Sequence, residues 1–110
     1  MSNLVDFSGS LDELKAAIAA HPGLVVVKFG STTCMPCKRV RMLMPGFAKE
    51  NPSVLFMNVE VDQDPERVFA SAYNITSVPN TKFFKAGEEV DYVIGAAVPQ
   101  IKAKIAQYSQ

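Results

Sequence analysis

The stretch "VVVKFGSTTCMPCKRV", residues 25–40, runs from a series of apolar residues into two cysteines that have two residues between them. Residues 24–29 are nearly all apolar and rich in β-branched side chains, which predicts a strand buried on both faces. From Met35 to about Glu50 the residues favour a helix, and Pro36 suits its first turn because an N–H there has no helical partner. The cysteines are therefore expected where a buried strand meets a helix.

The position of Cys34 and Cys37 at this junction indicates redox chemistry. The N-terminus of a helix carries a partial positive charge and unpaired N–H groups, which favour a thiolate at Cys34 and lower its pKa below the free value of about 8.5. Cys37 lies one helical turn later and can reach back to form a disulfide or resolve a mixed one. The pattern predicts Cys34 as the nucleophile and Cys37 as the resolving thiol.

Other roles for the pair are less well supported. A structural zinc site needs four ligands, and the chain has two cysteines and one histidine, without a second C-x-x-C motif. Four cysteines shared by a dimer, or two inert core thiols, remain alternatives. The polar residues Ser31–Thr33 before the pair indicate an accessible loop, so we expect redox chemistry and no metal site.

The composition limits the class of protein. The chain has 110 residues, of which 48% are hydrophobic, which predicts one domain spanning residues 1–110. Eleven basic residues balance eleven acidic ones, so we expect no binding to nucleic acid or membranes. The first ten residues resemble no secretion signal, which predicts a cytoplasmic protein. We expect a monomer whose partners are proteins or small molecules.

Local signals define the other elements. Ser10 and Glu13 form a capping box before an expected helix, and Asp64 is expected to cap another helix that has Pro65 at its first position. We expect Pro45 to kink or divide the helix over 35–50, to which Met42 supplies an apolar position. The remaining predictions are a weak strand at 4–7, a helix at 11–20, a strand at 53–61, a helix at 64–73, a hairpin at 80–95 turning at Ala86–Gly87, and a final helix from Pro99.

The order of these elements predicts the architecture. Strand-helix-strand units require parallel, right-handed crossovers, whereas the late hairpin adds antiparallel strands. The sheet should therefore be mixed, with helices covering both faces. This arrangement is a three-layer α/β sandwich.

Several linked motifs resemble one family. The chain resembles thioredoxin from about Leu4 to Tyr108, which implies a thioredoxin-like fold, a three-layer α/β/α sandwich with a central mixed β-sheet. The motifs are "VVVKF" before the cysteines, "CMPCK" at 34–38, "VEVDQDP" at 59–65, "TSVPNTKFFKAGE" at 76–88 and "VIGA" at 93–96.

The resemblance also implies a substrate-binding surface. Pro79 would be the family's cis-proline facing the cysteines, and Val78 would offer its backbone to an extended substrate peptide. Gly95 would border the same groove, where a residue without a side chain permits close approach. From the residues alone, Pro79 reads as an ordinary trans proline at a strand entrance and Gly95 as a strand terminator.

Three positions depart from the family pattern. Thr33 replaces a tryptophan before the first cysteine, and Met35 replaces a glycine after it. Lys28 replaces a buried aspartate that is held to assist proton transfer at the second cysteine. Because the residues between the cysteines tune the redox potential in this family, these changes put the usual strongly reducing potential in doubt.

Lys28 raises a problem of its own. Alternation along the strand points its side chain into apolar surroundings, and a buried lysine must find a partner or lose its proton. We hypothesise a contact with Glu60 on the next central strand; the alternative is that Lys28 extends to solvent at the strand end. A charged Lys28 near the pair would favour thiolate and a more oxidising potential.

The resemblance implies a protein disulfide reductase that carries electrons in cell redox homeostasis. We expect disulfide-containing client proteins and no bound prosthetic group. Electrons would come from NADPH through a thioredoxin-reductase-like flavoprotein, or from glutathione or another low-molecular-weight thiol. The alternatives are a glutathione-linked or oxidising enzyme and, in another class, a non-enzymatic adaptor that binds a partner protein.

Overall fold

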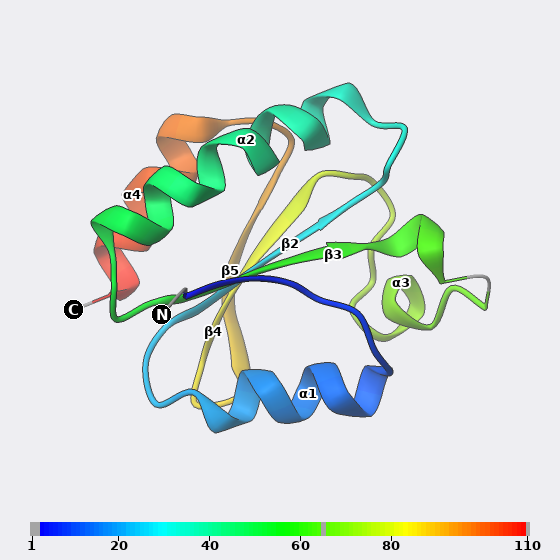
Figure 1. The fold of residues 1–110 in the computed structure, drawn as a ribbon, viewed down its shortest axis with the longest axis horizontal. Helices are drawn as coiled ribbons and strands as arrows, with labels where there is room; N and C mark the ends of the chain where they lie inside the picture. Colours follow the sequence, from blue (N-terminus) through cyan, green and yellow to red (C-terminus); the bar gives the residue numbers. More distant parts are fainter. Residues whose placement is uncertain (1–2, 65, 110) are drawn as a thin grey trace.

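The computed structural model of the protein describes residues 3–64 and 66–109, which form a five-stranded sheet with helices on both faces (Figure 1). The strand order is β1-β3-β2-β4-β5, in which β1, β3 and β2 are parallel and β4 and β5 are antiparallel to their neighbours. The predicted mixed sheet is therefore confirmed. The strands are β1 (Leu4–Asp6), β2 (Val25–Gly30), β3 (Leu55–Glu60), β4 (Asn80–Lys85) and β5 (Glu88–Ile94).

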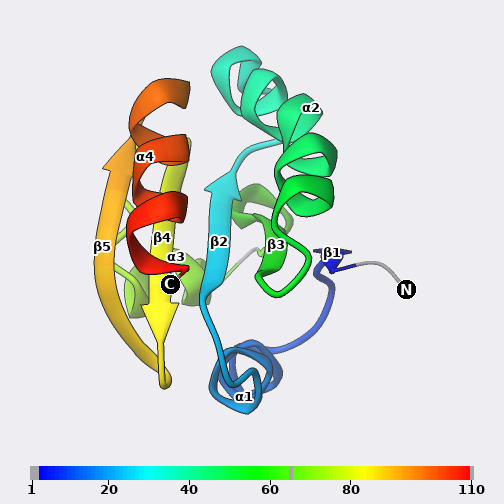
Figure 2. The same cartoon turned by 90° about the vertical axis from the view of Figure 1, so that its left-hand side faces the viewer.

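The helices complete the three layers. Helices α2 and α4 cover one face of the sheet, and α1 and α3 lie on the other, as Figure 1 and the turned view in Figure 2 show. The predicted α/β/α sandwich is confirmed. The helices are α1 (Leu11–Ala20), α2 (Met35–Glu50), α3 (Val68–Ala72) and α4 (Val98–Tyr108), with a short 3-10 helix, η1 (Val61–Gln63), after β3.

Strand β2 lies at the centre of the sheet, and all six of its residues are buried. Successive side chains point to opposite faces, so Val26 joins the core under α2 and α4 whereas Val25 and Val27 join the core over α1 and α3. The same alternation separates Phe83 and Phe84 on β4. Because β2 runs directly into the cysteine loop, both cores hold the start of that loop in place.

The signals at the ends of α1 and α2 have different outcomes. The predicted capping box is present: Ser10 Oγ accepts from the Glu13 N–H, and Glu13 Oε1 accepts from the Ser10 N–H. Pro45 lies inside α2 without dividing it, and its side chain is exposed. Met42 is 80% exposed, so its assignment to the apolar face was wrong; Met44 is buried there instead.

The helix expected over residues 64–73 is shorter than predicted. It spans only Val68–Ala72, and the chain before it forms η1 and a turn in which Arg67 is left-handed. Asp64 still binds the helix end, because its Oδ2 accepts from the Phe69 N–H at 2.8 Å. Pro65, the predicted first helical position, lies outside the described residues.

Helix α4 begins at Val98, with Pro99 in its first turn, close to the predicted start. The hairpin between β4 and β5 turns at Ala86 and Gly87 as predicted, and both residues have positive φ. Within residues 3–64 and 66–109, none of the helices has the length and apolar character needed to cross a membrane.

Candidate active site

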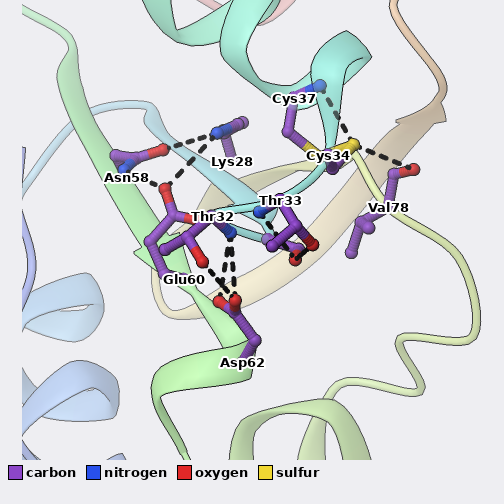
Figure 3. The surroundings of a disulfide bond; sticks show 10 residues. Lys28, Thr32, Thr33, Cys34, Cys37, Asn58, Glu60, Asp62 and Val78 are labelled. Atoms are coloured by element: carbon purple, nitrogen blue, oxygen red, sulfur yellow. Dashed lines mark hydrogen bonds and ion pairs between the residues drawn. A yellow bond between two sulfur atoms is a disulfide. The ribbon is translucent and has the colours of Figure 1, made fainter.

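The two cysteines lie at the N-terminus of α2, where Cys34 is the N-cap residue and forms a disulfide with Cys37 (Figure 3). The backbone N–H of Cys37 donates to Cys34 Sγ at 3.1 Å. This N–H is one of the donors that the first turn of a helix leaves without a helical acceptor. When the disulfide is reduced, the same N–H and the helix dipole favour a thiolate on Cys34.

The two cysteines differ in exposure. Cys34 is partly exposed, whereas Cys37 is 1% exposed and belongs to the buried side of α2. The residues around Cys34 are exposed as well: Thr33 and Pro36 face solvent, and Met35 is 67% exposed. Another molecule can therefore reach the sulfur of Cys34 but not that of Cys37.

A second loop faces Cys34. The Val78–Pro79 peptide bond is cis, the form that the resemblance implies, and the carbonyl oxygen of Val78 lies 3.9 Å from Cys34 Sγ. The Gly95 N–H donates to the Pro79 carbonyl at 2.8 Å, which joins a third segment to this surface. Gly95 has φ +91°, and a Cβ there would meet nothing within 4 Å. The three segments thus place an open backbone edge beside the accessible sulfur.

Lys28 lies beneath the cysteine loop and is 1% exposed, so it does not extend to solvent. Its Nζ donates to Asn58 Oδ1 at 2.8 Å and lies 3.8 Å from Glu60 Oε1, so the hypothesised contact with Glu60 is present (Figure 3). Burial lowers the pKa of Lys28. The nearby Glu60 and Asp6 carboxylates act in the opposite direction, and the Arg41 guanidinium adds to the lowering.

Asn58, which was not predicted from the sequence, is the nearer partner of Lys28. A signal was available: Asn58 precedes Glu60 by two positions on β3, so both side chains point to the same face of the sheet. Asn58 Nδ2 also donates to Glu60 Oε1 at 2.9 Å, so the three side chains form one buried network.

Asp62, in η1, was also missed. The Thr32 N–H lies 3.2 Å from each of its carboxylate oxygens, and the Thr32 hydroxyl donates to it as well. These hydrogen bonds lower the pKa of Asp62 and hold the loop before Cys34. Residues 32 and 62 are 30 positions apart, and no local pattern links them.

The site has no metal-binding arrangement in the part of the chain that the structure describes: no three His, Cys, Asp or Glu residues there are grouped to hold an ion. What the geometry provides is a disulfide with one accessible sulfur, a helix N-terminus and an adjacent backbone edge. Such an arrangement can exchange its disulfide with that of another molecule.

Known proteins share this sequence and fold. The family model Thioredoxin matches residues 7–107. Thioredoxin-2 of Saccharomyces cerevisiae is 35% identical over 97 residues, which cover 88% of this chain and 91% of the relative. The structure of Trichomonas vaginalis thioredoxin superposes with a TM-score of 0.86 and 35% identity, covering 98% of this chain and 99% of that chain.

Some relatives are longer proteins. The TPR repeat-containing thioredoxin TDX of Arabidopsis thaliana is 36% identical over 86 residues, which are 78% of this chain but 22% of the relative. The chain also spans only about half the length of two other curated relatives. The cysteine pair lies at disulfide distance, and several of the relatives are named thioredoxin. The match over residues 7–107 shows that the chain belongs to the thioredoxin family.

Proposed function

We propose that the protein reduces disulfide bonds in client proteins through its dithiol form. The thiolate of Cys34 attacks one sulfur of a client disulfide, which forms a mixed disulfide and releases the first client thiolate. The thiolate of Cys37 then attacks Cys34 Sγ, which forms the Cys34–Cys37 disulfide and releases the second client thiolate. Each released thiolate takes a proton from solvent, and two electrons pass from the protein to the client.

The observation that carries this proposal is the asymmetry of the pair. Cys34 combines an accessible sulfur with the N-terminus of α2, whereas Cys37 is 1% exposed and one turn away. A client can form a mixed disulfide with Cys34 alone, and the buried Cys37 is held where it can resolve that intermediate. Val78 offers a carbonyl beside Cys34, which supports backbone binding of an extended client peptide.

Trapping separates the two cysteine roles. We expect Cys37→Ser to accumulate a mixed disulfide with a disulfide-bonded test client such as insulin, and Cys34→Ser to form none. Both variants should lose multiple-turnover reduction of insulin with dithiothreitol as the electron donor. Trapping by Cys34→Ser and not by Cys37→Ser would exchange the two roles, and full activity in both variants would refute the mechanism.

The source of electrons and the setting are part of the same proposal. We infer that NADPH supplies electrons through a thioredoxin-reductase-like flavoprotein, in the cytoplasm, where the protein acts as a monomeric carrier in redox homeostasis. The relatives named thioredoxin support this choice. Reduction of the oxidised protein by NADPH and a purified reductase, compared with reduction by glutathione, tests it.

A second candidate is a glutathione-linked or oxidising enzyme. It is favoured by the exposed Met35 between the cysteines and by the buried cation Lys28 behind them. The reduction potential distinguishes the two: about −270 mV supports a general reductant, and about −200 mV or higher supports the second candidate. A protein that binds partners but never forms a reducible disulfide would instead be an adaptor.

A further inference from the structure

Lys28 and Cys37 meet at Gly30. A Cβ added to Gly30 would lie 2.7 Å from Lys28 Nζ and 3.2 Å from Cys37 Cβ. The lysine nitrogen and the buried cysteine therefore border the same small space, which the missing side chain of Gly30 leaves open. Both residues are only 1% exposed, so bulk water does little to screen a charge interaction between them.

We propose that Lys28 is a positioning residue for the resolving thiol: its ammonium stabilises the thiolate of Cys37 and so favours the dithiol form of the pair. This inference rests on the proposed function, because it assigns a role within the same site. It concerns Cys37 rather than Cys34, which has the helix N-terminus for its own stabilisation.

The network around Lys28 fixes its nitrogen near Cys37. Asn58 accepts from Nζ at 2.8 Å and Glu60 Oε1 lies at 3.8 Å, so one neutral acceptor and one carboxylate hold the ammonium in place. In Figure 3 the Lys28 nitrogen points to both partners, and the disulfide lies on its other side. Without these partners, burial would favour the neutral form of the lysine.

The other charged groups near Lys28 come from three elements. Asp6 on β1 and Glu60 on β3 are acidic, whereas Lys38 and Arg41 on α2 are basic, and Arg41 pairs with Asp6 at 3.2 Å. A cavity of about 80 Å³ lies between them, lined by Lys28, Ser31, Thr32, Lys38, Arg41 and Glu60. Its lining residues carry polar groups and it is large enough for water, which gives protons a route between the Lys28 network and solvent.

The charge balance explains how Lys28 acts in the resolving step. The Cys37 thiol loses its proton to solvent, and the thiolate attacks Cys34 Sγ, forming the disulfide and releasing the client thiolate. Burial lowers the pKa of Lys28, and a negatively charged thiolate nearby would raise it again. Thiolate formation on Cys37 and protonation of Lys28 should therefore support each other.

The test measures Cys37 alone. In the Cys34→Ser variant Cys37 is the only thiol, because the chain has two cysteines. Its ionisation is followed by the ultraviolet absorbance of the thiolate across pH, with Cys34→Ser/Cys37→Ser as the baseline that removes the tyrosine signal. Lys28→Met is then added to both, since Met keeps much of the apolar stem without the charge. Lys28→Gln is the second variant, because it keeps a donor for Asn58 if the first does not fold.

Lys82 provides the matched control. It is a second buried lysine of the same sheet, 5% exposed and paired with Glu89 at 3.0 Å. It lies on the opposite face, because its partner position on β2 is Val27, which belongs to the core over α1 and α3. Lys82→Met therefore removes a buried lysine without changing the charge near Cys37.

The expected result is specific to Lys28. Removing its charge should lower the thiolate fraction of Cys37 at a fixed pH below its pKa about tenfold, a rise of about one pKa unit. Lys82→Met should leave that fraction unchanged. An equal, small effect of both substitutions would overturn the proposal and leave Lys28 a structural role. Because no client is present, this outcome is independent of the insulin assay, whose failure would instead refute the proposed function.

Discussion

Among the described residues, each face of the sheet buries one lysine, and the two lysines find their partners in different ways. Lys82 lies on β4, next to the edge strand, and reaches Glu89 at 3.0 Å and the Tyr92 ring at 5.1 Å. The Glu89 side chain is 34% exposed, so this ion pair borders solvent. Lys82 thus behaves as a lysine whose stem is buried and whose charge lies near water.

Lys28 lies on the central strand, and its charged end does not reach solvent. Its nearest polar atom is the neutral Asn58 oxygen, its carboxylate partner Glu60 is farther away at 3.8 Å, and that side chain is only 17% exposed. Both lysines have a glutamate partner, so the depth of burial, and not the presence of a glutamate, decides how much free energy each buried charge requires. A lysine whose burial is energetically unfavourable and which lies near a reactive thiol indicates a role at the site rather than in stability.

The largest expected effect comes from removing each glutamate charge. Glu60→Gln should lower the free energy of unfolding by about 2 kcal/mol, because it leaves a deeply buried ammonium without its carboxylate. Glu89→Gln should cost less than about 1 kcal/mol, since that pair borders solvent. Chemical denaturation of the oxidised proteins measures both. Equal losses would break the comparison.

The pH dependence of stability should sharpen the comparison between Lys28 and Lys82. The pKa of Lys28 is lowered below 10.5 by burial, so between the folded and unfolded pKa values the unfolded chain binds more protons than the folded one. The free energy of unfolding due to Lys28 should therefore rise with pH in the alkaline range below 10.5, by at most about 1.4 kcal/mol per pH unit.

The measurement is the difference between oxidised wild type and oxidised Lys28→Met, in which the cysteines do not titrate. The wild type should gain stability relative to the variant as the pH rises. A difference that is constant over this range would mean that burial does not lower the pKa of Lys28.

The reduction potential tests the same contrast at the pair. If the Lys28 charge stabilises the Cys37 thiolate, Lys28→Gln should make the potential more negative, by up to about 30 mV at a pH where Cys37 is ionised, the equivalent of a tenfold change in the equilibrium constant. Lys82→Gln should leave the potential within error of the wild type. Equilibration with glutathione buffers and trapping of free thiols gives both values. A shift of the same size in both variants would count against a local effect.

The smallest effect concerns the space that Lys28 and Cys37 share. Gly30→Ala should destabilise the protein by about 1 kcal/mol, because the added methyl group would press on Lys28 Nζ and Cys37 Cβ. Gly46→Ala is the matched control: it lies inside α2, a Cβ there would meet nothing within 4 Å, and the change should stabilise by about 0.5 kcal/mol. Thermal unfolding compares the two, and a stabilising Gly30→Ala would contradict the close packing.

Much of the fold could be predicted because its signals are local. The capping box at Ser10, the apolar strand before the cysteines and the turn at Ala86–Gly87 each depend on neighbouring residues, and all are present. The shortened α3 could not be predicted from the Asp64 signal alone. Asp64 does bind a helical N–H, but that N–H belongs to Phe69, beyond a turn at Arg67 that a simple cap does not include.

The sequence by itself determined the strand-helix junction that carries Cys34 and Cys37, because two residues of spacing at a helix start bring the sulfurs within one turn. It also determined that Lys28 would face the interior, since side chains alternate along a strand. The contact with Glu60 was predicted as well, but only the tertiary structure decided that Asn58 is the nearer partner. Asn58 and Glu60 approach Lys28 because β3 pairs with β2 in one register, placing Asn58 opposite Lys28 and Glu60 opposite Gly30. Contacts between distant segments depend on that register, which is set by how the two strands pair and not by the residues of either strand alone.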